Sequence, residues 1–250
     1  MADLFILSAG AAAGLIEAIR PEFEAREGCT LRGEFGAVGA MKERFLAGAP
    51  CDAMISSRTV IDGLASAGHF AAGDVSTLGI VPTAVAFIED EGVPGAHPAI
   101  GDVPALVRAL TSASGIYVPD MQRATAGIHM RKSFASLGIL DRIKDRIREF
   151  SNGSTAMRAM AEAAMPGSIG CTQATEIVAT AGVVLAGPLP GDMALETEYC
   201  IGVPRRGAQP ALAAVLIDHL CAPAMAALKR RCGFEAASGS IGYQEGEASA

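Results

Sequence analysis

Short strand-like runs alternate with amphipathic segments in the first part of the chain. We predict strands over residues 4–7, 31–35 and 52–55, and helices over residues 12–26 and 41–47. The first helix shows the helical spacing most clearly, with Leu15, Ile19 and Phe23 on one face and Gly28 as its end. This order of elements predicts a parallel sheet with helices on both faces, which forms one lobe.

The same alternation returns after a long apolar run at residues 78–88. Pro82 interrupts this run, and we interpret the run as a crossing between two lobes because a central strand tolerates proline poorly. Further strands are predicted over 114–118, near Glu149 and over 167–171, helices over 126–137 and 155–164, a return crossing at 199–203, and helices over 208–220 and 222–232. The chain is thus an α/β protein in which residues 1–81 and 202–235 form lobe I, 82–201 form lobe II, and 236–250 form a disordered tail.

Small residues follow the strands of lobe I at the points where helices begin. They occupy residues 8–11, 36–40 and 56–59. The first N–H groups of a helix have no partner inside the helix, and the positive end of its dipole lies there, so bare helix starts attract anions. We therefore predict an anion site whose candidate binding residues in lobe I are Ser8, Gly10, Ala11, Val38, Gly39 and Ser56.

Composition narrows the classes of partner. The 250 residues are 50% hydrophobic and 19% charged, and no stretch approaches the roughly 20 apolar residues of a membrane helix. A formal net charge of -7 argues against nucleic acid or an anionic membrane as the partner. The six cysteines show no CxxC or CxxH spacing, so we expect no zinc site, no other metal and no cofactor.

The N-terminus bears on the compartment. The chain begins directly before its first predicted strand, without the basic segment, apolar stretch or cleavage site of a secretory signal. We therefore expect a cytoplasmic protein, or a periplasmic one if an export signal has been removed. Six cysteines that act mainly as small buried residues are typical of a reducing cytosol.

Four short segments carry a resemblance to a known family. They are Leu-Ala-Gly-Ala-Pro-Cys-Asp-Ala-Met-Ile-Ser at residues 46–56, Thr-Ala-Gly-Ile at 125–128, Glu-Tyr at 198–199 and Arg-Cys-Gly-Phe at 231–234. Over roughly residues 3–235 the chain resembles the molybdate-binding branch of the type II periplasmic binding proteins. The resemblance implies two Rossmann-like lobes on a two-stranded hinge, which close over an oxyanion held by helix N-termini. It also implies Ala126 and the backbone amide of Gly153 as anion-binding positions.

The chain departs from this family at three ligand positions. Molybdate binders of this type carry hydroxyl side chains at the first two helix N-termini and a tyrosine late in the second lobe. This chain has Ala11, residues 38–40 (Val-Gly-Ala) and Cys171 there. Each lost donor costs about 1 to 3 kcal/mol when its partner is left unpaired. We therefore expect molybdate and tungstate to bind weakly or not at all.

Other polar residues near the predicted helix starts of lobe II favour an organic anion. Arg123 precedes a predicted helix, and its planar guanidinium matches a carboxylate in a bidentate manner. Further hydroxyl and amide groups follow at Thr125, Asn152, Ser154, Thr172, Gln173 and Thr175. The alternatives are that Asn152 or Ser154 only caps a helix and that Arg123 only forms a surface ion pair.

Three residues are candidates for moving a proton in such a site, namely Cys171, Glu176 and His129. A cysteine at a strand end becomes reactive where a helix N-terminus lowers its pKa, and the alternative for Cys171 is a small buried core residue. The alternative for His129 is packing or surface exposure. We interpret Asp52 as a structural cap or turn residue. Ser8 has no accompanying His and Asp pattern and no Gly-x-Ser-x-Gly elbow, which disfavours hydrolase chemistry.

These features support two classes of function. The first is a cytoplasmic isomerase that shifts the double bond of an unsaturated di- or tricarboxylate, similar to aconitate isomerase, an enzyme of the same superfamily. The alternative is a solute-binding protein of an ABC importer for an oxyanion or small carboxylate, with an ABC permease as partner if the protein is exported. A cytoplasmic ligand sensor is a third class, for which the sequence shows no partner surface.

Overall fold

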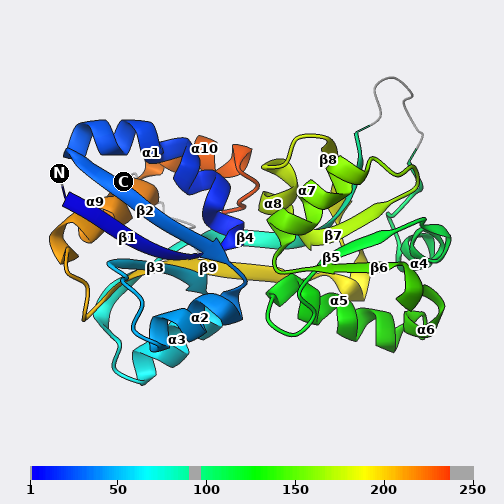
Figure 1. Cartoon of the computed structure of the whole chain (residues 1–250), viewed down its shortest axis with the longest axis horizontal. Helices are drawn as coiled ribbons and strands as arrows, with labels where there is room; N and C mark the ends of the chain where they lie inside the picture. The colour runs from blue at the N-terminus through cyan, green and yellow to red at the C-terminus, as the bar shows by residue number, and fades with distance from the viewer. Residues whose placement is uncertain (1, 90–96, 237–250) are drawn as a thin grey trace, which may run out of the picture.

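The chain folds into two α/β lobes that lie side by side (Figure 1). The computed structural model describes residues 2–89 and 97–236, so the predicted tail lies outside the described residues apart from Ala236. Within these residues the strand order is β2-β1-β3-β9-β4-β7-β5-β6, and β8 pairs with β4. Strands β4 (Phe70–Ile88) and β9 (Glu196–Pro204) run between the lobes. The two-lobed α/β architecture is as predicted.

Lobe I contains three parallel strands with helices on both faces. Its elements are β1 (Ala2–Ala9), η1 (Gly10–Ala12), α1 (Ala13–Glu27), β2 (Cys29–Gly36), α2 (Val38–Leu46), β3 (Ala53–Ser57), α3 (Arg58–Ser66), α9 (Pro210–Cys221), η4 (Pro223–Met225) and α10 (Ala226–Arg231). Neighbouring strand residues face opposite sides: Ile6 and Ile55 pack under α1 and α9, whereas Leu7 and Met54 pack under α2 and α3.

Lobe II repeats this arrangement. Its elements are α4 (Val103–Ser112), β5 (Ile116–Pro119), α5 (Thr125–Ser136), α6 (Leu140–Ile143), η2 (Lys144–Arg146), β6 (Ile147–Phe150), α7 (Gly153–Ala163), β7 (Ile169–Gln173), α8 (Ala174–Val178), β8 (Val183–Pro188) and η3 (Gly191–Met193). Strands β5, β6 and β7 are parallel. The sequence analysis did not identify α4, α6, α8 or β8. Both α6 and α8 are too short to show a helical period, and β8 has no continuous buried face.

Strand β4 contains Pro82 and still continues from one lobe to the other. Residues up to Pro82 pair with β9, and residues from Thr83 onward pair with β7 and β8. Pro82 lies opposite Glu196, the first residue of β9, so the missing N–H falls where β4 changes partner. This explains how a long crossing strand tolerates a proline. The exact lobe boundaries, after residues 81 and 201, stay predictions.

A polar network joins both crossing strands to lobe I. Arg58 at the start of α3 contacts the Glu198 carboxylate through Nη2 at 2.7 Å and Nε at 3.2 Å. Thr77 of β4 donates to the same carboxylate at 2.8 Å. The Arg58 guanidinium, the largest contributor, holds the pKa of Glu198 below its usual value. The crossing strands are thereby held to each other next to the start of α3.

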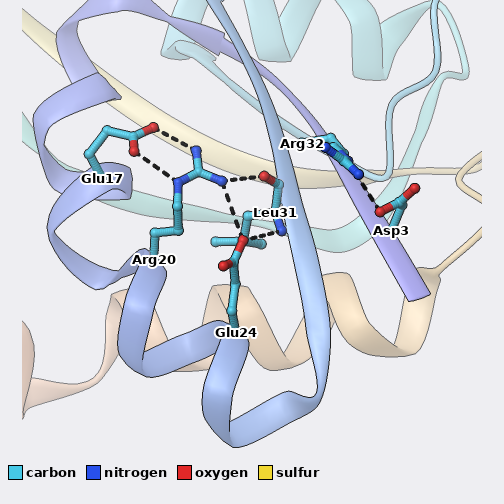
Figure 2. A network of polar contacts seen from close by, with 6 residues as sticks. All are labelled: Asp3, Glu17, Arg20, Glu24, Leu31 and Arg32. Carbon is cyan, nitrogen blue, oxygen red and sulfur yellow. Dashed lines mark hydrogen bonds and ion pairs between the residues drawn. The ribbon is translucent and has the colours of Figure 1, made fainter. Parts of the chain in front are cut away.

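A second network fastens α1 to β2 (Figure 2). Arg20 pairs with Glu17 at 2.6 Å and donates to the carbonyl of Leu31, whose own N–H donates to Glu24 at 2.7 Å. These bonds satisfy both backbone groups of Leu31 on the outer strand β2, so α1 is fixed in register with the sheet. Because η1 leads directly into α1, the position of η1 is fixed as well.

The apolar core of lobe I continues into lobe II. Met157 and Met160 of α7 and Ile177 of α8 belong to the same buried cluster as Leu15 and Ile16 of α1. The lobes are therefore in apolar contact on one side of the molecule. Within the described residues, no single helix is long and apolar enough to cross a membrane. Helix α9 and the helical segment at Pro223–Arg231 meet the length and composition limits only when taken together, and they are bent by 58° relative to each other.

Asp52 explains why the Gly-Ala-Pro-x-Asp segment matters structurally. Its side chain is 2% exposed and accepts hydrogen bonds from the backbone N–H groups of Phe5, Ala208 and Gln209 at 2.7–2.9 Å. One carboxylate thus joins β1, the start of β3 and the start of α9. The interpretation of Asp52 as a structural cap is confirmed.

We predict that Asp52→Ala destabilises the protein by about 3 kcal/mol, because three partly buried N–H groups lose their acceptor. The midpoint of thermal unfolding should fall by roughly 6 to 12 °C for a domain of this size. Asp52→Asn, which keeps one acceptor oxygen, should lose about half as much. Asp218→Ala removes an exposed acid from α9 and serves as the control. Equal midpoints for Asp52→Ala and this control would contradict the assignment.

Candidate functional site

A small cavity lies where the parallel strands of both lobes end and their helices begin. Its volume is about 20 Å³. It is lined by Ala9, Gly10, Ala11, Gly36, Ala37 and Val38 of lobe I, by Pro119, Ala124, Thr125, Ala126, Asn152, Gly153, Thr172, Gln173 and Glu176 of lobe II, and by Tyr199 of β9. A water molecule needs roughly 10–15 Å³ on the same measure, so the cavity has room for a compact group.

Backbone N–H groups dominate this cavity because few side chains cap the helices around it. Residues Ala9, Ala37 and Ala124 precede η1, α2 and α5, and none of them has a side chain that can accept a hydrogen bond. At α7, Asn152 caps the helix by accepting from the Thr155 N–H at 2.9 Å. Helix starts from both lobes therefore direct their positive ends at one small volume.

Glu176 places a carboxylate inside this amide-rich cavity. The residue is 6% exposed, and Oε2 accepts a hydrogen bond from Thr172 Oγ1 at 2.5 Å. The backbone N–H groups of Gly153, Ser154 and Gln173 also donate to the carboxylate. Burial raises the pKa of Glu176, and these four hydrogen bonds oppose the increase. The side chain therefore joins the starts of α7 and α8.

Two further polar side chains lie beside this carboxylate. Tyr199 is 2% exposed, and burial together with the charge of Glu176 raises its pKa, so its hydroxyl stays protonated. Gln173 is 3% exposed, and its Nε2 donates to Thr197 Oγ1 at 3.4 Å. The Gln173 Oε1 atom has no hydrogen-bond partner among the described residues.

The structure brings some of the predicted site residues together at this cavity. They are Gly10, Ala11, Val38, Thr125, Ala126, Gly153, Gln173 and Glu176. Ser8 and Ser56 do not line it: both are fully buried within strands, and the Ser8 hydroxyl donates to the Ala9 carbonyl at 2.9 Å. Ser154 lines an outer groove with its side chain while its N–H reaches Glu176.

Arg123, Gly39 and His129 lie in an open groove of about 680 Å³ between α2, α3 and α5, which adjoins the cavity at Val38 and Thr125. The Gly39 N–H donates to the Arg123 carbonyl across the lobes at 3.1 Å. The Arg123 side chain is 57% exposed and lies 3.8 Å from the Glu43 carboxylate. His129 Nε2 is 2.7 Å from the carbonyl oxygen of Met193. None of these side chains lines the cavity.

Cys171 faces away from the cavity because side chains alternate along β7. It is fully buried in the core between β4, β5 and α5, and burial raises its pKa to about 12. A neutral thiol in this core does not exchange protons with a ligand in the cavity. Its neighbour Thr172 faces the cavity instead, so a hydroxyl stands one residue after the position that the family resemblance assigned to Cys171.

Sequence reasoning marked residues 36–40 as a helix start but did not name Gly36 or Ala37 as binding residues, and it missed Pro119 and Ala124. All four line the cavity without a reactive side chain, and their only sequence signal is their place after a strand. Gly127 has a related role, because a Cβ at this position would overlap the carbonyl oxygens of the loop before α5. Within the described residues, no group of three or more His, Cys, Asp or Glu could hold a metal ion.

Comparison with solved structures shows the same fold in anion-binding proteins. The periplasmic molybdate-binding protein of Azotobacter vinelandii is 19% identical, with a TM-score of 0.75 over 94% of this chain and 99% of that one. The sulfate-binding protein SubI of Mycobacterium tuberculosis is 16% identical, with a TM-score of 0.71 over 96% and 88%. A substrate-binding protein of an ABC transporter from Agrobacterium tumefaciens is 14% identical, with a TM-score of 0.71 over 96% and 81%.

At these identities the likenesses establish the fold, which is that of the type II periplasmic binding proteins. No curated protein sequence is significantly similar to this chain. The family model of the bacterial extracellular solute-binding proteins matches residues 4–235, nearly the whole described chain. The chain therefore belongs to the family of bacterial extracellular solute-binding proteins.

Proposed function

We propose that this protein binds a small tetrahedral oxyanion between its lobes and delivers it to an ABC importer. The observation that carries the proposal is the cavity itself, which is lined by helix starts from both lobes and by no cationic side chain. Such a site holds an anion through backbone N–H groups and hydroxyls. Relatives in fold are described as molybdate-binding and sulfate-binding proteins, which agrees with this chemistry.

The same observations disfavour the predicted isomerase. Of its three proposed proton carriers, Cys171 and His129 lie outside the cavity, and only Glu176 lines it. The matched family consists of extracellular binding proteins, so it supports neither an isomerase nor the predicted cytoplasmic location. We propose a periplasmic receptor, with an ABC permease as partner.

Closure of the lobes is the step that completes this site. Residues of both lobes line the cavity, and β4 and β9 connect the lobes. In the closed arrangement the Gly39 N–H bonds to the Arg123 carbonyl across the groove. A ligand that bonds to amides of both lobes stabilises this closed form relative to an open one. A receptor that closes on its ligand gives the permease a shape by which to recognise loaded protein.

We predict that at least one of phosphate, sulfate and molybdate binds with a dissociation constant at or below about 1 μM, equivalent to about -8 kcal/mol. Molybdate should be the weakest of the three, because Ala11 and residues 38–40 carry no hydroxyl group. Isothermal titration calorimetry between about pH 5 and about pH 8 measures this. Trans-aconitate should neither bind nor be converted to an isomer, because no cationic side chain lines the cavity to pair with three carboxylates and only one of the three predicted proton carriers, Glu176, lines it. Binding or isomerisation of trans-aconitate would overturn the proposal, as would the absence of binding for all three oxyanions at every pH.

We predict that Gly153→Ala lowers the affinity for the bound oxyanion by more than about tenfold, which is about 1.4 kcal/mol. A Cβ at this position would overlap Glu176 Oε2 and Thr172 Oγ1, so the start of α7 must move away from the cavity. Gly63→Ala is the matched control, since a Cβ there meets no atom within 4 Å. Equal affinities of the two variants would place the ligand elsewhere.

We predict that Arg123→Ala lowers the affinity by less than about fivefold. The guanidinium is exposed and, among the residues that the structure describes, forms its one ion pair with Glu43; exposed ion pairs contribute about 0 to 1 kcal/mol. Glu43→Ala should have an effect of similar size, because it removes the other half of the same pair. A loss of more than about tenfold with Arg123→Ala alone would show that the guanidinium contacts the ligand.

A further inference from the structure

The cavity contains one acid and no base. Among its lining residues Glu176 is the only one with a carboxyl group, and none is Lys, Arg or His. An anion that enters this cavity therefore meets a carboxyl group without a compensating cation. If both carry full negative charge at contact distance, they repel each other strongly in this buried environment.

The groups that face Glu176 are hydrogen-bond donors rather than charges. Thr172 of β7 and the N–H groups at the starts of α7 and α8 donate to it, and Tyr199 of β9 is the titratable group beside it. From lobe I, Gly10 of η1 is adjacent, since a Cβ there would lie 2.7 Å from Oε1. The charged residues of the packed helices, Glu17, Arg158 and Glu162, line an outer groove that adjoins the cavity at Gly10 and Asn152, and none of the three lines the cavity itself. No cation therefore offsets the Glu176 charge from within the cavity.

An unpartnered acceptor points to a proton on the ligand. Gln173 lines the same cavity, is 3% exposed, and its Oε1 lacks a donor among the described residues. A buried acceptor without a donor is costly, and a ligand O–H group would satisfy it. The cavity thus offers two acceptors, Gln173 Oε1 and the Glu176 carboxylate, within a shell of backbone donors.

We propose that this site binds its oxyanion together with one proton, which is held between the Glu176 carboxyl group and an oxygen of the ligand. This inference rests on the proposed oxyanion-binding function and adds its substrate class. Hydrogen phosphate brings the proton itself, so Glu176 stays ionised and accepts a hydrogen bond from the O–H group of the phosphate. Sulfate carries no proton near neutral pH, so its binding requires one proton from solvent on Glu176. The cavity therefore prefers protonated tetrahedral oxyanions over fully deprotonated ones.

The test is the pH dependence of affinity for sulfate and phosphate in the full chain, measured by calorimetry from about pH 5 to about pH 8. Above the pKa of Glu176, the sulfate affinity should fall about tenfold per pH unit, because one proton is taken up. The phosphate affinity should change much less. Titrations in buffers of different ionisation enthalpy should give about one proton taken up per sulfate and about none per hydrogen phosphate.

Glu176→Gln supplies the matched variant, since an amide can donate to the anion without taking up a proton. The variant should bind sulfate with an affinity that no longer depends on pH, and it should lose the preference for phosphate. Glu22→Gln, the same change on the exposed face of α1, should behave like the parent.

Sulfate binding without proton uptake in the parent protein would overturn the inference, and this result does not depend on the folding of any variant. It would leave the proposed function intact, because sulfate would still be bound. Failure of phosphate, sulfate and molybdate to bind at every pH would overturn the proposed function and this inference with it, whereas binding of molybdate alone would overturn only this inference.

Discussion

The unpaired N–H groups at the helix starts are the constraint that organises the centre of this molecule. Each helix that follows a parallel strand begins with N–H groups that cannot bond within the helix. Around the cavity, the starts of η1, α2 and α5 carry no side-chain cap, and small residues leave their amides accessible. A group that accepts hydrogen bonds must therefore fill this volume, and the fold supplies one such group itself through Glu176.

Glu176 has a structural consequence and a chemical one. By accepting from the amides of Gly153 and Ser154, it satisfies the start of α7, and by accepting from Gln173 it satisfies the start of α8. The same burial disfavours its ionised form, so the cavity combines strong donors with an acid that resists charge. Whether this acid is charged decides whether the cavity attracts or repels an anion.

The sequence determined most of the fold, because the spacing of apolar residues that marks a strand or a helix is visible within a short stretch of the chain. Apolar spacing located the strands of lobe I and its helices α1, α2, α9 and α10 but not α3, and the run at residues 78–88 was recognised as a crossing. Asp52 was identified as a cap, which its bonds to Phe5, Ala208 and Gln209 confirm. The short elements α6, α8 and β8 were missed, because they depend on packing against neighbours rather than on their own pattern.

By itself the sequence also determined where bare helix starts lie, since strand ends and small residues are visible in it. Only the tertiary structure decided which side chains reach that point. Alternation along β7 turned Cys171 into the core and Thr172 into the cavity, and the loop before α5 left the Arg123 side chain in the outer groove. The physical reason is that segments distant in sequence form the cavity, so packing between the lobes set the direction and the burial of these side chains.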